Sequence, residues 1–204
     1  MTVREHLKSV PGLVPIVRWL RGPTPPPGHG HYWEGRKHLV YYREVVRLAK
    51  RHCAAAHTVI DVGAKQNPFV LQLDWIAHKT RLDIEPAAAL PGCLTIQADF
   101  MEYCIGEPFD LALCLQVLEH LENPEPFARK LLAAGRTVIL SVPYRWPAGL
   151  APSHRQDPVD ELRLRQWTGE PWVDQSLVRE RNGLERLIVV LPGPPADRGS
   201  AGRR

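Results

Sequence analysis

Short apolar runs alternate with polar or amphipathic segments through the middle of the chain, and this alternation constrains the fold more than any other feature. Five runs have the length of buried strands, and they read TVIDVG, TRLDIEP, CLTIQADF, DLALCLQV and RTVILSVP. Apolar residues fill these runs almost continuously, which is typical of parallel strands that are covered on both faces. The sequence therefore predicts an open, mostly parallel α/β sheet with right-handed crossovers.

Three segments between or before these runs are predicted to be helical. Residues 31–52 have a broad apolar face. Residues 68–79 begin with Pro68 at the first helical position, and Asn67 is the expected N-cap. Residues 123–135 form a third helix that Gly135 closes. A late apolar run, residues 184–192, is expected to be an antiparallel edge strand of the same sheet.

Composition predicts one globular domain. The 204 residues are 44% hydrophobic and 24% charged, and no apolar run approaches the roughly 20 residues that cross a membrane. The four cysteines lack paired spacing and are expected to be reduced thiols, which favours a cytoplasmic protein. We expect an N-terminal arm and Pro-rich linker at 1–30, the folded domain at 31–192 and a disordered tail at 193–204. The arm could pack on a second subunit and form a homodimer.

Acidic residues stand at the predicted carboxyl ends of three strands, where open α/β sheets bind ligands. These residues are Asp61, Asp83 and Asp99. A single aspartate in such a place commonly caps a strand or a helix, but three at successive strand ends favour a binding site. After the first strand, Lys65 and Asn67 replace the glycines that let a backbone approach a pyrophosphate. A ligand with a ribose but no phosphate, such as S-adenosylmethionine, suits this loop.

The segments VIDVGAKQNP, LDIEP, QADF and FDLALCLQVLEHLENP together resemble the class I S-adenosylmethionine-dependent methyltransferases, over roughly residues 36–145. The resemblance implies a Rossmann-like, doubly wound sheet of seven strands, with the last strand antiparallel. It also implies a set of cofactor contacts, which are Asp61, Gly63, Ala64, Asp83, Ile84, Asp99, Phe100, Leu115 and Gln116. Arg36 and Lys37 could pair with the methionine carboxylate, or they could be solvated helix charges.

A second cluster of polar residues is expected after the fourth and fifth strands. Both segments end at the same sheet edge, so Glu119, His120 and His154 could converge there. An E-x-x-E-H motif with a later histidine resembles the metal-assisted O-methyltransferases, which implies Mg²⁺ held by these three residues. Gln116 replaces the first glutamate of that motif and would weaken the binding of a divalent ion. Alternatively, His154 acts as a general base without a metal, or His120 lies under the cofactor and His154 on the surface.

Aromatic residues near these segments suggest an acceptor. Tyr32, Trp33, Tyr144 and Trp146, together with nearby carboxylates and guanidinium groups, are typical of a site for a neutral polyhydroxyl compound such as a sugar. The same residues could instead pack a lid. Residues 142–169 resemble a segment of small bacterial methyltransferases that act on polysaccharides or secondary metabolites, among them the mycobacterial sugar O-methyltransferases of methylmannose polysaccharide assembly. The leading interpretation is O-methylation of a sugar or another small hydroxylated metabolite.

Two other interpretations remain open. An RNA or tRNA methyltransferase would need a basic face around the cleft. The net charge of +4 lies partly in the tail, and the mixed charges of residues 155–165 argue against such a face. A non-catalytic cofactor-binding subunit is the other alternative, because the loop after the first strand departs from the glycine-rich pattern. In that case Glu119, His120 and His154 would be dispensable.

Overall fold

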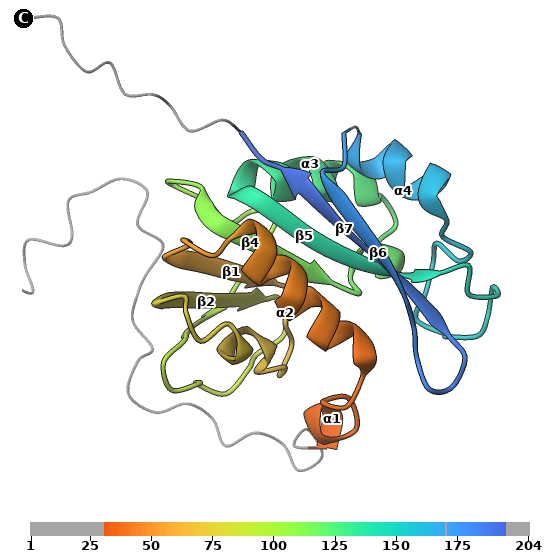
Figure 1. Cartoon of the computed structure of the whole chain (residues 1–204), viewed down its shortest axis with the longest axis horizontal. Coiled ribbons are helices and arrows are strands. Elements are labelled where there is room, and N and C mark those ends of the chain that lie inside the picture. The colour runs from red at the N-terminus through yellow and green to blue at the C-terminus, as the bar shows by residue number, and fades with distance from the viewer. Residues whose placement is uncertain (1–30, 170, 195–204) are drawn as a thin grey trace, which may run out of the picture.

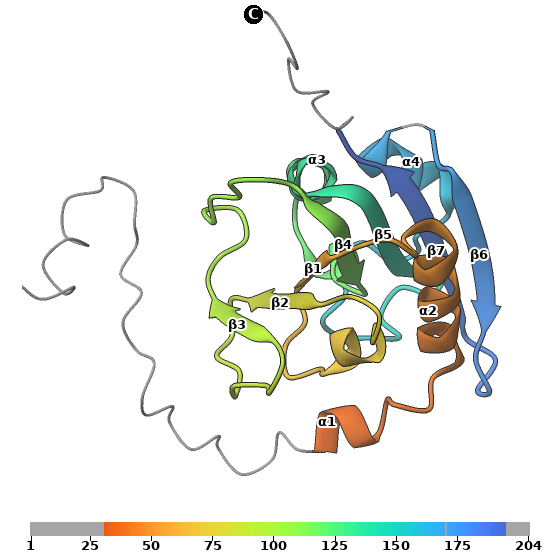
Figure 2. The ribbon, with the colours of Figure 1, turned by 60° about the vertical axis from the view of Figure 1, so that its left-hand side comes forward.

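The computed structural model describes residues 31–169 and 171–194, and its centre is one seven-stranded sheet. The strand order is β3-β2-β1-β4-β5-β7-β6 (Figures 1 and 2). The strands are β1 Thr58–Val62, β2 His78–Asp83, β3 Leu94–Gln97, β4 Phe109–Leu115, β5 Gly135–Tyr144, β6 Asp174–Arg179 and β7 Glu185–Pro192. The helices are α1 His31–Glu34, α2 Val40–His52, η2 Phe69–Gln72, η3 Leu118–His120, α3 Pro124–Ala134 and α4 Glu161–Thr168, of which η2 and η3 are 3₁₀ helices.

The predicted mostly parallel, doubly wound sheet is confirmed. Strands β1, β2, β3, β4 and β5 pair in parallel, and β7 is antiparallel to both of its neighbours. The late strand was expected at the edge, but β7 lies between β5 and β6, and the edge strand is β6. Their burial gives the reason: β7 is an almost continuously buried run, whereas most β6 residues alternate between partly buried and exposed, as expected for an edge.

Helices cover both faces of the sheet (Figures 1 and 2). On one face, α3 and α4 pack over a core that includes Leu131, Ala134 and Leu164. On the other face, α2 and η2 bury a second core that includes Val45 and Phe69. The sheet therefore lies between two apolar cores, and functional polar side chains are expected at the ends of its strands.

Two of the predicted helices are shorter than expected. The segment 31–52 is interrupted between α1 and α2, where Gly35 lowers helix propensity. The predicted helix 68–79 is only the one-turn η2, and β2 already begins at His78. The predicted start is off by one residue, because η2 begins at Phe69 and Pro68 is its N-cap. The Asn67 Oδ1 atom nevertheless accepts a hydrogen bond from the Phe69 N–H at 2.9 Å. Beyond η2, the Trp75 indole N–H donates to the Cys53 carbonyl oxygen at 3.0 Å.

Gly135 ends α3 as predicted, but for a different reason. Its φ of −136° is extended, so it does not form a left-handed cap, and it is the first residue of β5. A Cβ atom at this position would lie 2.7 Å from the Ala112 Cβ atom of β4. Glycine is therefore required because α3 runs directly into a strand that lies close to its neighbour.

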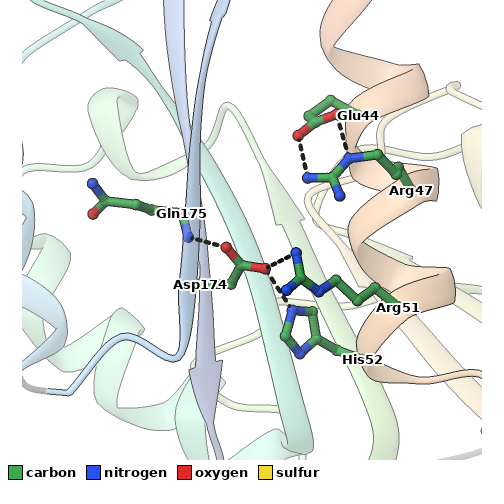
Figure 3. A network of polar contacts seen from close by, with 6 residues as sticks. All are labelled: Glu44, Arg47, Arg51, His52, Asp174 and Gln175. Carbon is green, nitrogen blue, oxygen red and sulfur yellow. Dashed lines mark hydrogen bonds and ion pairs between the residues drawn. The ribbon is translucent and has the colours of Figure 1, made fainter.

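Polar contacts fix the end of α2 to the edge strand β6 (Figure 3). The Asp174 Oδ2 atom lies 2.8 Å from His52 Nε2 and 3.4 Å from Arg51 Nη1, both in the last turn of α2. The hydrogen bond from His52 is the largest cause that lowers the pKa of Asp174. These contacts join the last turn of α2 to β6, which lies at the opposite end of the strand order from β3.

The remaining expectations concern termini, cysteines and membranes. Residues 1–30 and 195–204, on which the predicted arm and nearly all of the predicted tail fall, lie outside the described residues. All four cysteines are free thiols. Within residues 31–169 and 171–194, no helix combines the length and the hydropathy that a membrane span requires.

Candidate functional site

A cavity of about 1030 Å³ opens at the carboxyl ends of the parallel strands. Strand order reverses between β1 and β4, and this is the position where open α/β sheets bind ligands. All nine residues predicted as cofactor contacts line the cavity, namely Asp61, Gly63, Ala64, Asp83, Ile84, Asp99, Phe100, Leu115 and Gln116. The cavity has two ends, one formed by the tips of β1, β2 and β3 and the other by segments that follow β4 and β5.

The loop after β1 explains how side chains replace glycines. Gly63 has a φ of 77°, and a Cβ atom there would lie 2.5 Å from the Val117 Cγ2 atom, so only glycine fits. Lys65 also has a positive φ, of 47°, and its N–H donates to Asp83 Oδ2 at 2.7 Å. Its side chain is exposed and lies 3.7 Å from Glu85. The lysine therefore contributes a backbone turn to the cavity and sends its charge into solvent.

The tips of β2 and β3 present hydrogen-bond acceptors. The buried Asp83 carboxylate accepts from the Lys65 and Glu85 N–H groups, each through a different oxygen, and retains further acceptor capacity. Asp99 is exposed, and its Oδ1 atom accepts from the Met101 N–H at 2.8 Å. Beside it, Phe100 is buried against Phe127 with the ring centroids 4.8 Å apart. This end offers two carboxylates and an aromatic ring to a ligand.

Asp61, at the floor of the cavity, is a buried acid. Burial raises the pKa of its carboxyl to about 7; Arg81, its partner in the register of β1 and β2, opposes the increase, and Asp83 adds to it. Asp61 is 3% exposed. It is therefore sensitive to pH in a range where ordinary aspartates stay ionised.

At the opposite end, Glu119, His120 and His154 come together as predicted. Their ligand atoms all lie within 4.8 Å of one another. Glu119 is fully buried, and neither of its carboxyl oxygens has a hydrogen-bond partner among the described residues. Burial raises its pKa to about 8. A buried carboxyl without a partner is costly, so an ion or a ligand that contacts Glu119 would be favoured at this position.

Neighbouring groups orient both histidine rings. His154 Nδ1 lies 2.7 Å from Asp157 Oδ2, and the two side chains are 8% and 2% exposed. His120 Nδ1 lies 3.0 Å from the Ser153 carbonyl oxygen, and burial lowers its pKa. For each ring this leaves Nε2 without a hydrogen bond in the described part of the chain. Ring orientation by a carboxylate or a carbonyl is typical of histidines that bind metals or move protons. The role of Asp157 was not predicted, although its spacing of three residues from His154 is visible in the sequence.

Gln116 does not join this cluster. It has a φ of 60°, its Oε1 atom accepts from Arg186 Nε at 3.1 Å, and its Nε2 donates to Ser141 Oγ at 3.2 Å. Arg186 is buried, lines the cavity and forms an ion pair with Glu180 at 3.2 Å. Sequence reasoning missed Arg186, because a charged residue inside an apolar strand is the only local signal and β7 lies far along the chain from β4.

The aromatic residues predicted to bind an acceptor separate in the structure. Trp146 lines the cavity, but Trp33 packs on Tyr42 with ring centroids 5.3 Å apart, and neither Trp33 nor Tyr144 is among the cavity residues. The Tyr144 hydroxyl instead donates to Glu161 at 2.9 Å. Nothing is described of the Tyr32 side chain.

The two basic residues before α2 also differ from each other. Arg36 lines the cavity, whereas Lys37 forms an ion pair with Glu34 at 2.5 Å. The methionine-carboxylate role therefore stays a prediction for Arg36, whereas Lys37 is exposed in the turn between α1 and α2. Tyr41, one turn further along the chain, lines the cavity as well and was not predicted.

Comparisons with solved structures agree on the architecture. The 1,6-didemethyltoxoflavin N1-methyltransferase of Burkholderia thailandensis, in a structure with S-adenosylhomocysteine, superposes with a TM-score of 0.62 at 18% identity over 85% of this chain and 93% of that one. The N-methyltransferase NodS of Bradyrhizobium japonicum WM9, with S-adenosylhomocysteine, gives 0.59 at 14% over 76% and 86%. The magnesium protoporphyrin IX methyltransferase of Synechocystis PCC 6803, also with S-adenosylhomocysteine, gives 0.59 at 18% over 76% and 82%.

This chain has the fold of those methyltransferases. No family model and no curated protein matches the sequence. The structural likeness, at these identities, extends to the fold, and the function must be argued from the cavity.

Proposed function

We propose that this chain is an S-adenosylmethionine-dependent O-methyltransferase that acts on a hydroxyl group of a sugar or another small hydroxylated metabolite. One observation carries the proposal. A single cavity has acidic strand tips at one end and a buried cluster of one carboxyl and two imidazoles at the other. The first end suits an adenosine, and the second suits a hydroxyl that must lose its proton.

The cofactor half of the proposal rests on the tips of β1, β2 and β3. Asp83 retains acceptor capacity for the two ribose hydroxyls, and Asp99 can accept from the adenine amino group while Phe100 packs beside the ring. The three solved structures described above contain S-adenosylhomocysteine, which supports the same ligand here. Gly63 leaves room for the methionine part, since Val117 closes the space on its other side.

Glu119, His120 and His154 have the composition of a divalent metal site. The unpartnered Glu119 carboxyl and the two free Nε2 atoms fit an ion, and the second-sphere contacts of both rings support it. A bound ion would lower the pKa of a hydroxyl that coordinates it. Two imidazoles suit Mn²⁺, Fe²⁺ or Zn²⁺ better than Mg²⁺, which prefers oxygen ligands. The amide of Gln116, engaged by Arg186 and Ser141, adds no further oxygen.

The reaction requires only positioning and proton transfer from this chain. The acceptor oxygen attacks the methyl carbon in line with the sulfonium, the carbon–sulfur bond breaks, and S-adenosylhomocysteine leaves with the electron pair on sulfur. Where no ion is bound, the hydroxyl proton passes to His154 Nε2, and Asp157 stabilises the resulting imidazolium through Nδ1–H. Burial lowers the pKa of His120, which favours its neutral form.

Calorimetry with S-adenosylhomocysteine tests the cofactor half. Gly63→Ala should abolish measurable binding, because its Cβ atom would meet Val117 at 2.5 Å. Gly92→Ala is the matched control, since Gly92 has almost the same φ, 76°, but no atom within 4 Å of its Cβ position. Equal binding by wild type and Gly63→Ala, or no binding by wild type, would exclude the proposed cofactor site.

A screen of hydroxylated sugars and metabolites with methyl-labelled cofactor tests the reaction. The product should be a methyl ether, and His154→Ala should lose turnover while still binding S-adenosylhomocysteine. Full turnover in that variant would remove the catalytic role of His154. Binding of the cofactor without any methyl transfer to a broad panel would favour the non-catalytic subunit, and activity on RNA that falls steeply with salt would favour the nucleic-acid alternative.

A further inference from the structure

Five side chains from four separate segments form one continuous row along the cavity wall. Tyr41 of α2 lies 4.9 Å from the Arg186 guanidinium, which lies 5.3 Å from the Trp146 ring. Trp146 stacks on His154 at 5.6 Å, and His154 meets His120 edge-on at 4.8 Å. All five residues line the cavity. The row therefore has a guanidinium toward one end and the imidazole pair at the other, with one indole between them.

Arg186 is held rigidly but is not fully hydrogen-bonded. Its Nε–H donates to Gln116 at 3.1 Å, and its Nη1 atom lies 3.2 Å from Glu180 Oε1. Buried Nη1 has no hydrogen-bond partner in the described part of the chain, so its contact with Glu180 is an ion pair without hydrogen-bond geometry. The side chain is only 8% exposed. A buried guanidinium with donors left over is costly unless an acceptor completes it.

Glu180 does not satisfy Arg186 because its carboxylate has another role. Its Oε2 atom accepts from the Val40 N–H at 2.8 Å, and its Oε1 atom accepts from the Tyr41 N–H at 3.2 Å. These are first-turn N–H groups of α2, so the carboxylate is shared with the positive end of the helix. A second guanidinium, that of Arg36, also lines the cavity, and both guanidinium groups lower the pKa of Glu119. The Glu180 carboxylate is therefore shared between two backbone N–H groups and the Arg186 guanidinium.

We infer that the acceptor carries a carboxylate, which Arg186 binds while the acceptor hydroxyl lies at Glu119, His120 and His154. This inference rests on the proposed function and narrows its substrate class from neutral sugars to hydroxylated acids, such as uronic acids or hydroxyaryl acids. Because Nε–H donates to Gln116 and Nη1 faces Glu180, the donors left for the two carboxylate oxygens are the remaining N–H groups of the two terminal nitrogens. Because the Trp146 ring lies between Arg186 and His154, the carboxylate and the hydroxyl of the acceptor should be separated by about the width of one ring.

The methionine part of the cofactor is the other possible source of a carboxylate. The two sources differ in what the loss of Arg186 changes. If Arg186 binds the acceptor, its removal leaves the affinity for S-adenosylhomocysteine within about twofold. If it binds the cofactor, its removal weakens S-adenosylhomocysteine but not 5′-methylthioadenosine, which has no carboxylate.

The experiment is an NMR titration of the protein saturated with S-adenosylhomocysteine, read at the Trp146 indole N–H. That resonance is assigned by its loss in Trp146→Phe. The probes are two matched pairs: glucuronate with glucose, and 4-hydroxybenzoate with 4-hydroxybenzyl alcohol. The variant is Glu180→Gln with Arg186→Gln, which removes both charges of the buried pair and so avoids leaving Glu180 unpaired. Arg186→Gln alone is compared with it.

At least one acid should bind wild type tenfold or more tightly than its neutral partner, and the double variant should lose that preference. The inference is overturned if neither acid is preferred, if the double variant keeps the preference, or if the variant loses S-adenosylhomocysteine affinity tenfold but keeps that for 5′-methylthioadenosine. Transfer of labelled methyl groups to neutral acceptors alone would overturn the inference and leave the proposed function standing. Binding of an acid at Arg186 without any methyl transfer would support the carboxylate site and contradict the proposed O-methyltransferase function.

Discussion

The two ends of the cavity are built in different ways. At the β1–β3 end, the Asp83 and Asp99 carboxylates belong to strand tips and accept from backbone N–H groups two to eighteen residues away. At the β4–β7 end, the contacts join segments far apart in the chain, such as His120 with Ser153 and Gln116 with Arg186. Among the described residues, the buried side-chain atoms that lack a hydrogen-bond partner all lie at the second end, on Glu119, Asp157 and Arg186.

This difference predicts that the first end serves ligand binding and the second end serves the chemical step. A site whose acceptors are already oriented by backbone groups can bind a ligand with little rearrangement. A site that keeps buried polar atoms unsatisfied retains free energy that a ligand, ion or transition state can recover. We therefore expect changes at the two ends to affect different measured quantities.

The largest effect is expected for the Glu119–His120–His154 cluster. Glu119→Gln and His154→Ala should each reduce turnover by roughly 100-fold or more, which is the usual contribution of a positioned base or metal ligand. Their dissociation constants for S-adenosylhomocysteine should stay within about threefold of wild type. Calorimetry measures the dissociation constant for S-adenosylhomocysteine, and initial rates on the same preparations measure turnover. If cofactor affinity falls as much as turnover does, the two ends of the cavity do not have separate roles.

Asp83→Asn should produce the opposite pattern. A hydrogen bond to a charged group contributes about 1.5–3 kcal/mol, so the affinity for S-adenosylhomocysteine should fall roughly 30-fold. Turnover at saturating cofactor should change by less than about threefold. Asp110→Asn is the control, because Asp110 also accepts backbone N–H groups, those of His57 and Thr58, but lies at the amino end of β4. Loss of turnover without loss of affinity in Asp83→Asn would contradict the assignment.

Asp61 should make stability depend on pH. Burial raises its pKa to about 7 in the folded state, above the unfolded value, so unfolded chains release this proton first and stability falls as pH rises toward 7. Between pH 6 and pH 8 the wild type should lose about 1 kcal/mol of unfolding free energy that Asp61→Asn keeps. Denaturant titrations of both proteins at the two pH values measure this. Parallel changes in wild type and variant would show that another group titrates.

The smallest effect is expected at Asp174, which joins β6 to α2 outside the cavity (Figure 3). Asp174→Asn removes a partly exposed ion pair, so stability should fall by less than about 1 kcal/mol. Neither cofactor affinity nor turnover should change. A clear change in either quantity would mean that α2 transmits strain to the cavity, and the two ends could then not be treated as independent of the scaffold.

The residues at the β1–β3 end of the cavity could be predicted from the sequence, because their contacts are local. Those at the β4–β7 end could be predicted only in part, because their contacts join distant segments. Asp61, Asp83 and Asp99 follow apolar runs directly, so their position at strand tips could be predicted from the chain alone. The convergence of His120 and His154 required only that two strand ends share an edge. Arg186 could not be found in this way, because its place in the cavity depends on β7 inserting between β5 and β6.

The predicted helix 68–79 shows a different limit. Its apolar spacing and its Asn67–Pro68 start are compatible with a full helix. The segment instead buries Phe69, Val70, Leu73 and Ile76 beneath α2 and returns to the sheet within a few residues. Tertiary packing decided the outcome where local preference did not. Likewise, Trp33 and Tyr144 were grouped with Trp146 because all three are aromatic, but of these three only Trp146 lines the cavity.

The contact between Gly63 and Val117 has one more consequence. Val117 lies two residues before Glu119, on the short segment that leads into η3. If the cofactor binds as proposed, the turn at Gly63 packs against the segment that carries Glu119 and His120, with the Val117 side chain between them. The size of the side chain at position 117 would then set the distance between the cofactor and these two residues.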